Sequence, residues 1–318
     1  MDKVNRRRFL ETMGVGLTAA LASPVVHGAE LAPLPRRPLG KTGVDVSAFT
    51  FGGGSHFLSR IGGDEAKAEQ LLVRALELGI TSFDTAASYT FRPHERLSER
   101  IFGRVLSPHR ARIFLSTKTQ ARDRDGVLRS VETSLKLLRT DRIDLVQMHS
   151  LQSFDELNEI ETGALAALRK LKAEKVVRFI GATGHYDPQV LKQAVERFEL
   201  DTLLMSLNAA QASHPLSMSP GRPLAGFERD VLPAARKKGV GVIAMKVMGQ
   251  GTIVGEGAGR ARPDELIRYA LSLPVASVEI AHTSLEILEG NVAAARSFRP
   301  MRGEEKAALR RRLEAREA

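Results

Sequence analysis

Four side chains that could together move a proton lie in the first half of the chain. Asp84 ends the apolar segment 80–83, and Tyr89 follows after four intervening residues in D-T-A-A-S-Y. Lys118 ends the segment that reads S-T-K, and His149 ends D-L-V-Q-M-H. Each of these segments has the apolar character of a buried strand. The four groups are therefore expected at strand ends, where an acid, a phenol, an ammonium and an imidazole can share one pocket.

These four groups suit the protonation of a substrate oxygen. A phenol has a pKa of about 10, so it is a weak acid at neutral pH. A neighbouring ammonium favours the phenolate and lowers that pKa, while a carboxylate keeps the ammonium charged and in place. An imidazole can donate a hydrogen bond to the substrate oxygen. The set fits an acid that protonates the alkoxide formed when hydride reaches a carbonyl carbon, and hydride needs a carrier because no side chain can supply it.

A regular alternation of strands and helices carries these residues. The apolar runs predict strands at 46–51, 80–84, 113–117, 143–148, 176–182, 202–207, 240–245 and 276–281. Helical periodicity predicts helices within 64–78, 95–104, 126–139, 154–173, 188–199, 228–238, 263–272 and 284–295. Repeated strand–helix units over about 250 residues predict an α/β fold, a single-domain (β/α)8 TIM barrel whose strand ends meet at one mouth. A doubly wound sheet is disfavoured, because the glycines at 52–54 lack the G-x-G-x-x-G spacing.

The N-terminus has the composition of an export signal. A charged start with Arg6 and Arg7 precedes Phe9 and Leu10, and an uncharged run of about 15 residues follows at 12–26. Such a run is shorter than the roughly 20 residues that a membrane span needs. The arginine pair resembles a twin-arginine signal, which passes folded proteins to the twin-arginine export machinery. The alternative is a basic, poorly ordered N-terminal helix.

These features predict the order of segments along the chain. We expect a twin-arginine-type signal peptide at 1–29, a flexible lead-in at 30–37, the barrel at 38–300 and a charged helical tail at 301–318. The protein is then expected in the periplasm without a stable membrane span after cleavage, or in the cytoplasm if the signal is not used.

Composition excludes several other classes of protein. The chain has 318 residues, a net charge of +10 and no Cys or Trp. Without Cys there are no disulfides, thiolate metal sites or Cys-bound iron–sulfur clusters. The basic residues alternate with acidic ones on helical segments, which is typical of a solvated face rather than of nucleic-acid binding. We expect a monomer that binds neither nucleic acid nor metal.

The spacing Asp84-x4-Tyr89, with Lys118 and His149 in that order, resembles the catalytic tetrad of the aldo-keto reductases. The similarity extends from Leu39 to about Asn291. It implies a (β/α)8 barrel that binds NADP(H) without a Rossmann domain and reduces a small-molecule aldehyde or ketone. It further implies that Tyr89 is the proton donor, that His149 orients the substrate, and that Lys118 and Asp84 tune Tyr89.

The same resemblance implies a set of cofactor contacts. These are Gly53 after the first strand, Thr183 and Gly184 at the nicotinamide amide, Lys246, Met248, Gly249 and Gly251 at the pyrophosphate, and Thr283, Ser284 and Asn291 at the adenosine phosphate. His185 or Asn208 could replace the amide that Gly184 lacks. Ala281 and Ile287 occupy positions that are basic in the family, so a modest preference for NADP(H) is expected and NAD(H) remains open. Protonated His282 would strengthen this preference below about pH 6.5.

Two other functions remain open from the sequence. A barrel aldolase or lyase would form a Schiff base on Lys118, which requires a neutral amine, whereas Asp84 would keep it charged. A nucleotide-sensing or subunit barrel would bind the cofactor with little turnover. The first choice is an NAD(P)H-dependent aldo-keto reductase; the carbonyl it reduces is not specified by these residues.

Overall fold

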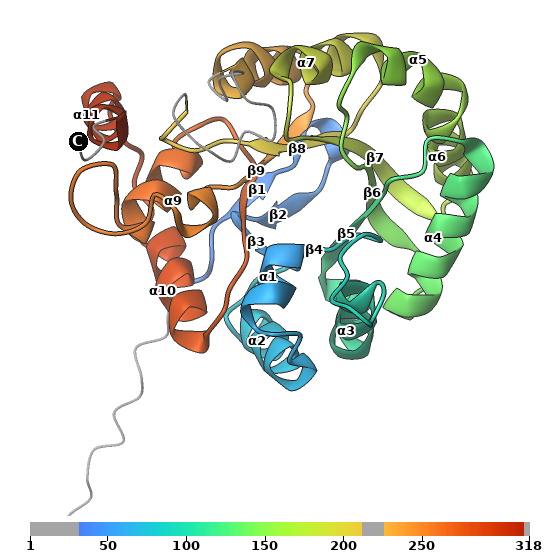
Figure 1. The fold of residues 1–318 in the computed structure, drawn as a ribbon, viewed down its shortest axis with the longest axis horizontal. Coiled ribbons are helices and arrows are strands. Elements are labelled where there is room, and N and C mark those ends of the chain that lie inside the picture. The colour runs from blue at the N-terminus through green and yellow to red at the C-terminus, as the bar shows by residue number, and fades with distance from the viewer. Residues whose placement is uncertain (1–31, 212–225, 315–318) are drawn as a thin grey trace, which may run out of the picture. The chain divides into compact units, whose positions relative to one another are not determined.

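Eight parallel strands close into a barrel in the computed structural model, which describes residues 32–211 and 226–314 (Figure 1). Around the barrel the strands follow the order β10-β3-β4-β5-β6-β7-β8-β9. Their bounds are β3 Phe49–Gly52, β4 Ser82–Asp84, β5 Phe114–Thr119, β6 Ile143–Met148, β7 Val177–Gly184, β8 Thr202–Ser206, β9 Gly241–Met245 and β10 Ser277–Ile280. The predicted (β/α)8 barrel is confirmed.

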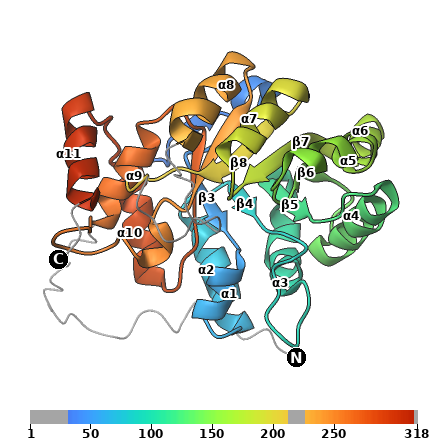
Figure 2. The same ribbon diagram turned by 45° about the horizontal axis from the view of Figure 1, so that its top comes forward.

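Helices surround the strands on the outside of the barrel (Figures 1 and 2). They are α1 Ser55–Arg60, α2 Glu65–Glu77, α3 Leu97–Leu106, α4 Arg124–Leu138, α5 Phe154–Thr162, α6 Ala164–Ala173, α7 Pro188–Arg197, α8 Leu232–Lys237, α9 Pro263–Leu271, α10 Leu285–Arg296 and α11 Gly303–Glu314. Side chains preceding several helices cap them: Asp64, Asp123 and Ser153 each accept a hydrogen bond from a backbone N–H of the first turn. In the described part of the chain, no helix is long and apolar enough to cross a membrane.

The start of the barrel differs from the prediction. Residues 36–38 of the expected flexible lead-in form β1 Arg36–Pro38, which pairs antiparallel with β2 Asp45–Ser47. The expected strand at 46–51 is therefore divided between this hairpin and β3. Burial explains the order of this segment, because Leu39 is fully buried and packs among the residues that fill the barrel interior. At Gly40 the hairpin touches β9, and a Cβ there would lie 2.3 Å from the Gly241 nitrogen.

Two predicted helices are interrupted. The helix expected at 154–173 is broken at Gly163, whose φ is −95° and ψ is −98°. A Cβ at Gly163 would lie 2.2 Å from the Arg122 carbonyl oxygen, so the close approach of the loop after β5 requires glycine here. The helix expected at 228–238 begins with a π-turn over Phe227–Val231 before α8 starts.

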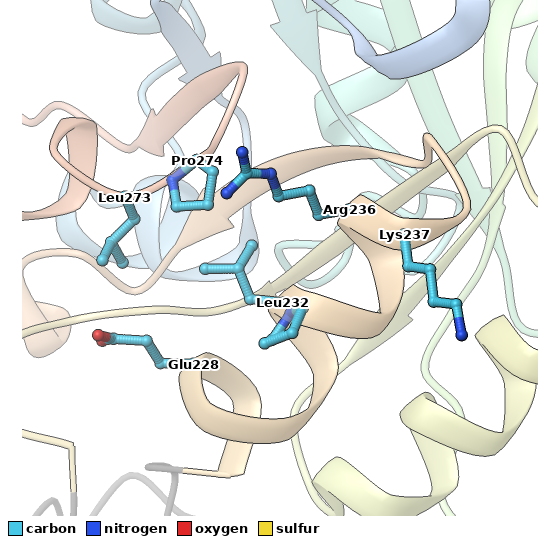
Figure 3. Close-up of a pocket in the computed structure, with 7 residues that line it drawn as sticks. Glu228, Leu232, Arg236, Lys237, Leu273 and Pro274 are labelled. Carbon is cyan, nitrogen blue, oxygen red and sulfur yellow. The ribbon is translucent and has the colours of Figure 1, made fainter.

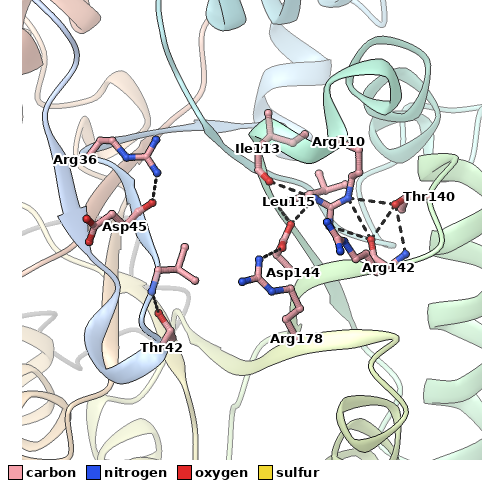
Figure 4. Close-up of polar contacts among 11 residues, drawn as sticks. Arg36, Thr42, Asp45, Arg110, Ile113, Leu115, Thr140, Arg142, Asp144 and Arg178 are labelled. Atoms are coloured by element: carbon pink, nitrogen blue, oxygen red, sulfur yellow. Dashed lines mark hydrogen bonds and ion pairs between the residues drawn. The ribbon is translucent and has the colours of Figure 1, made fainter.

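Ion pairs join the strands at the end opposite the predicted mouth. Asp144, which is 1% exposed, accepts hydrogen bonds from Arg178 at 2.6 Å and from the Leu115 nitrogen at 2.9 Å. Arg110 approaches the same carboxylate to 2.6 Å (Figure 4). Asp144 is the second residue of β6, and Leu115 is the second residue of β5. One carboxylate therefore ties β5, β6 and β7 together.

The charged tail is helical over α11, and this helix packs on the rest of the chain. Leu309 and Leu313 are each 4% exposed, and Arg310 donates hydrogen bonds to Glu228 and to the Tyr269 hydroxyl. Tyr269 also donates to Glu228 at 2.7 Å. These contacts attach α11 to α9 and to the segment that precedes α8.

Candidate active site

The four predicted proton-transfer residues converge at the carboxyl ends of neighbouring strands. Asp84 is the last residue of β4, Lys118 is the fifth residue of β5, and His149 directly follows β6. Tyr89 lies in the loop after β4. Backbone hydrogen bonds position this loop: the Ala87 nitrogen donates to the Lys118 carbonyl at 3.0 Å, and the Tyr89 nitrogen donates to a carbonyl three residues earlier at 3.1 Å.

Lys118 is the centre of the cluster, and all three of its ammonium hydrogens have an acceptor. Its Nζ donates to Asp84 in a buried ion pair, to the Thr85 carbonyl at 3.0 Å and to the Tyr89 hydroxyl at 3.0 Å. Lys118 and Asp84 are each 1% exposed. A buried ammonium with three acceptors stays charged, because deprotonation would leave one acceptor without a donor and the buried Asp84 carboxylate without its counter-charge.

The electrostatics agree with a charged Lys118. Burial lowers the pKa of the Lys118 ammonium, but Asp84, Tyr89 and Glu279 together raise it above its ordinary value. Burial raises the pKa of Tyr89 to about 12, with Lys118 opposing this shift and the two carboxylates adding to it. The sequence predicted that Lys118 would make the phenol more acidic. Lys118 does lower the pKa of Tyr89, but the loss of hydration on burial raises that pKa by more.

His149 is a neutral imidazole beside the phenol. Its ring centroid lies 5.8 Å from that of Tyr89 with an interplanar angle of 87°, and its Nδ1 lies 3.3 Å from the Ser88 hydroxyl. Burial, Lys118 and Arg122 lower the pKa of His149 to about 3. When the Ser88 hydroxyl donates to Nδ1, the other nitrogen carries the hydrogen and can donate to a substrate oxygen.

Two further polar side chains contact Asp84, and sequence reasoning missed both. The Gln147 amide donates to Asp84 Oδ1 at 3.3 Å, and the carboxyl group of Glu279 forms a side-chain hydrogen bond with Asp84. Gln147 precedes His149 by two residues, which places it on the same face of β6. Glu279 is the one charged residue in β10. The spacing of Gln147 from His149 and the single charge in the β10 segment are the sequence features that could have indicated these two residues.

Polar atoms without partners line the interior next to the tetrad. In the described ranges, Thr183 Oγ1, His185 Nδ1 and Ser206 Oγ are buried and accept or donate no hydrogen bond. The His185 ring lies 5.8 Å from that of His149. Because buried polar groups are almost always paired, these atoms fit a polar ligand such as a nicotinamide amide. Asn208 does not, since its amide already bonds the Lys246 carbonyl and the Ala210 nitrogen.

The loop after β9 presents a cation. Lys246 has a left-handed φ of 57° and is partly buried, and its ammonium forms no ion pair or hydrogen bond with the described residues. Burial lowers the pKa of this ammonium. Met248 packs against the core, and the Gly249 and Gly251 nitrogens donate within the loop at 2.8 Å each. The two glycine amides are therefore engaged, and the side chain of Lys246 is the group suited to a phosphate.

The segment after β10 lacks the positive charge that was expected from a protonated His282. Ser284 caps α10 by accepting from the Ile287 nitrogen at 3.2 Å, Thr283 is partly exposed beside it, and Asn291 is buried in α10. His282 was expected to gain a proton near pH 6.5, and this is wrong. It is fully buried, its ring lies 5.4 Å from Phe49, and burial lowers its pKa to about 3.

The two remaining predicted glycines face the helices. A Cβ at Gly53 would lie 2.5 Å from the Phe102 ring of α3, and one at Gly184 would lie 2.6 Å from Leu191 of α7. Close packing of helices on strand ends therefore accounts for both glycines. A Cβ at Gly184 would also lie 3.1 Å from the Phe227 ring.

A surface pocket of about 550 Å³ lies elsewhere (Figure 3). Its walls are Glu228, Leu232, Pro233, Arg236, Lys237, Leu273 and Pro274. Lys237 and Pro274 precede β9 and β10, so this pocket belongs to the end of the barrel opposite the tetrad. It contains none of the tetrad residues. Across the described ranges, no group of three or more His, Asp or Glu residues could hold a metal ion.

Comparison with known proteins agrees with the barrel fold and identifies a family. The aldo/keto reductase family model matches residues 49–297. The L-galactose dehydrogenase of Arabidopsis thaliana is 31% identical over 70% of this chain and 67% of its own length. A methylglyoxal reductase of Escherichia coli strain K12 is 27% identical over 74% of this chain and 77% of its own.

Solved structures show the same similarity. An aldo-keto reductase from Bacillus halodurans, in its holo form, superposes with a TM-score of 0.69 at 26% identity, covering 90% of this chain and 97% of that one. The apo form of the same protein gives a TM-score of 0.67. The chain belongs to the aldo/keto reductase family. It is an NAD(P)H-dependent oxidoreductase.

Proposed function

We propose that this enzyme reduces an aldehyde or ketone, with Tyr89 as the proton donor to the carbonyl oxygen. The observation that carries the proposal is the 3.0 Å hydrogen bond from the Lys118 ammonium to the Tyr89 hydroxyl, with the ammonium anchored by Asp84. Because Lys118 donates to the phenol oxygen, the phenol hydrogen is free to point toward a substrate. The same ammonium stabilises the phenolate that remains after proton transfer.

His149 orients the substrate in this proposal. A neutral imidazole can donate one hydrogen bond to the carbonyl oxygen without taking its proton, and the pKa of about 3 keeps the ring neutral at physiological pH. Tyr89 and His149 contact each other edge to face, so both can reach one oxygen atom. The carbonyl would then accept two hydrogen bonds, one of which becomes the transferred proton.

The residues around the mouth fit a bound NADP(H), which supplies the hydride. Thr183 and His185 have polar atoms without partners among the described residues, which suit the nicotinamide amide, and the Lys246 ammonium, also without such a partner, suits a phosphate. Thr283 and Ser284 at the start of α10 suit the adenosine end. NAD(H) would use the same groups, apart from those that contact a 2′-phosphate.

The alternatives receive less support. Schiff-base chemistry needs a neutral amine, whereas Asp84, Tyr89 and Glu279 raise the pKa of Lys118. A cofactor-binding sensor would not need the tetrad to be assembled. The deciding experiment is a fluorescence titration with NADPH and NADH, followed by turnover on a panel of aldehydes and ketones. Tight cofactor binding without turnover of any carbonyl would contradict the reductase and favour the sensor.

We further propose that the enzyme acts outside the inner membrane, after export by the twin-arginine machinery. The support is the arginine pair at positions 6 and 7 and the apolar run after it. These residues lie outside the described part of the chain.

A further inference from the structure

Glu279 faces the barrel interior beside Asp84, the member of the tetrad that ends β4. One layer below, the hydroxyl of Thr50 is 2.7 Å from that of Ser277 and 2.9 Å from that of Ser82, and all three residues are fully buried. Side chains two residues apart on a strand point to the same face. Moving two residues along β10 and β4 therefore leads from Ser277 and Ser82 to Glu279 and Asp84.

The neighbouring strand β3 leaves room for this glutamate. Gly52 ends β3, and a Cβ on it would lie 3.0 Å from both Cγ and Oε1 of Glu279. Such distances are tighter than ordinary van der Waals contact, so any larger residue at 52 would press against the glutamate. The Glu279 side chain thus occupies the space that a side chain at position 52 would need.

The surroundings of Glu279 do not suit a negative charge. Glu279 as a whole is half-buried, but its Oε2 is buried and has no hydrogen bond in the described ranges, and its carboxyl group is adjacent to that of Asp84. Among the described residues the cation that acts on Glu279 is Lys118, whose hydrogens are already donated to Asp84, Thr85 and Tyr89. Two adjacent carboxylates with one shared ammonium carry a net negative charge unless one of them binds a proton.

We propose that Glu279 is a positioning residue of the active site, which in its protonated form donates a hydrogen bond to Asp84 and limits the negative charge facing Tyr89. This inference rests on the proposed function, because Tyr89 is taken as the proton donor. Asp84 accepts from Lys118 and Gln147, so it is the partner that stays ionised. The proton of the pair accordingly resides on Glu279.

The electrostatics support this assignment. Burial raises the pKa of Glu279 to about 8, with the Asp84 carboxylate adding to the shift and Lys118 opposing it. Burial also raises the pKa of Asp84, so the two carboxyl groups titrate as a pair. Once Glu279 ionises, its charge raises the pKa of Tyr89. A less acidic phenol gives up its proton less readily, so carbonyl reduction should slow as the pH rises through about 8.

The kinetic test compares the native enzyme with Glu279→Gln, which is neutral at every pH and nearly the same shape. We expect the variant to keep kcat within about threefold of native at pH 7. Native kcat should fall by about threefold or more between pH 7 and pH 9, whereas the variant should show no such fall. Glu289→Gln, an exposed change that only removes a surface pair with Arg74, should behave as native. A fall of equal size in Glu279→Gln would overturn the proposal.

A second measurement is independent of activity. Since the folded pKa of about 8 lies above the ordinary value of 4.5, folding takes up a proton between these limits. The unfolding equilibrium constant is measured in denaturant for both cofactor-free proteins. The constant of the unsubstituted enzyme, divided by that of Glu279→Gln, should therefore rise by about tenfold per pH unit in this window. A ratio that does not change with pH would show an ionised Glu279 and overturn the proposal. If no carbonyl is reduced at all, the reductase fails, while this ratio still reports whether Glu279 carries a proton.

Discussion

The Lys118 ammonium lies 3.0 Å from the Tyr89 hydroxyl oxygen and 4.7 Å from the centre of the same ring. It therefore faces both the oxygen and the π-electrons of the phenol it is expected to tune. Its charge lowers the pKa of Tyr89, yet burial and two nearby carboxylates raise the net value to about 12. Lys118 thus limits the loss of acidity that burial imposes on Tyr89, and an incoming substrate meets a fully protonated phenol.

Replacing Tyr89 by Phe should remove the acid and little else. We expect kcat for carbonyl reduction to fall by roughly 10²–10⁴-fold, because general acids contribute about that much, while cofactor affinity changes by no more than a few-fold. Tyr269→Phe is the matched control, since it removes a hydroxyl that bonds Glu228 and Arg310 far from the tetrad. It should lower stability and leave kcat unchanged. A Tyr89→Phe enzyme that keeps more than about a tenth of native kcat would exclude Tyr89 as the donor.

Replacing Lys118 by Met should abolish activity and shift the pH profile of any residual rate to higher pH. The sign follows from the charge: the ammonium lowers the pKa values of Tyr89, Asp84 and Glu279, so its loss raises all three. The measurement is kcat against pH for both proteins. Trapping of a substrate adduct on native Lys118 by borohydride would support the Schiff-base alternative and contradict this role.

Asp144 offers a test of the fold that is separate from catalysis. Asp144→Asn should destabilise the protein by about 3 kcal/mol, because it leaves Arg110 and Arg178 without their shared buried carboxylate. Denaturant unfolding monitored by circular dichroism measures this loss. Asp264→Asn makes the same chemical change in an exposed pair with Arg262 and should cost less than about 1 kcal/mol. Equal effects of the two changes would mean that Asp144 does not tie the strands together.

The sequence located the tetrad because each member is marked by its position. Asp84, Lys118 and His149 each close an apolar run, and in a barrel such positions converge whatever the exact register. Glu279 had no comparable signal, since one carboxylate within a strand can point inward or outward until the register is known. The size of the Tyr89 shift also depends on burial, which the sequence does not measure.

The predictions from sequence were wrong where tertiary packing, rather than the local sequence pattern, determines the structure. Helical periodicity continues across Gly163, but the chain breaks there because the Arg122 carbonyl approaches too closely for a side chain. The lead-in looked flexible because it is rich in Pro and Arg, yet Leu39 buries completely and orders the hairpin around it. His282 looked like a titratable group at a strand end. It lies instead within 5.4 Å of the Phe49 and Phe51 rings, where a charged imidazole is disfavoured.

Export can be tested without an assay for activity. Changing Arg6 and Arg7 to Lys should leave the protein uncleaved in the cytoplasm, because twin-arginine signals depend on the arginine pair. The native protein should appear outside the inner membrane, shortened by about 28 residues. Cell fractionation followed by mass measurement decides between them. The same distribution and mass for both proteins would reduce the segment to a basic tail with no role in export.

The cofactor preference should be small and independent of pH. Ala281 and Ile287 offer no charge to a 2′-phosphate, while Thr283, Ser284 and the start of α10 can still bind an anion. We therefore expect NADP(H) to bind at most about tenfold more tightly than NAD(H), which is about 1.4 kcal/mol.

His282 should not change the ratio of the two dissociation constants between pH 6 and pH 8, because burial keeps its ring neutral in this range. Lys246→Met should weaken both cofactors by a similar factor, since its ammonium suits the pyrophosphate that they share. Lys136→Met, which removes an exposed pair with Glu132, is the matched control and should change neither constant. A thousandfold preference for NADP(H) that disappears in Lys246→Met would instead place this ammonium on the 2′-phosphate.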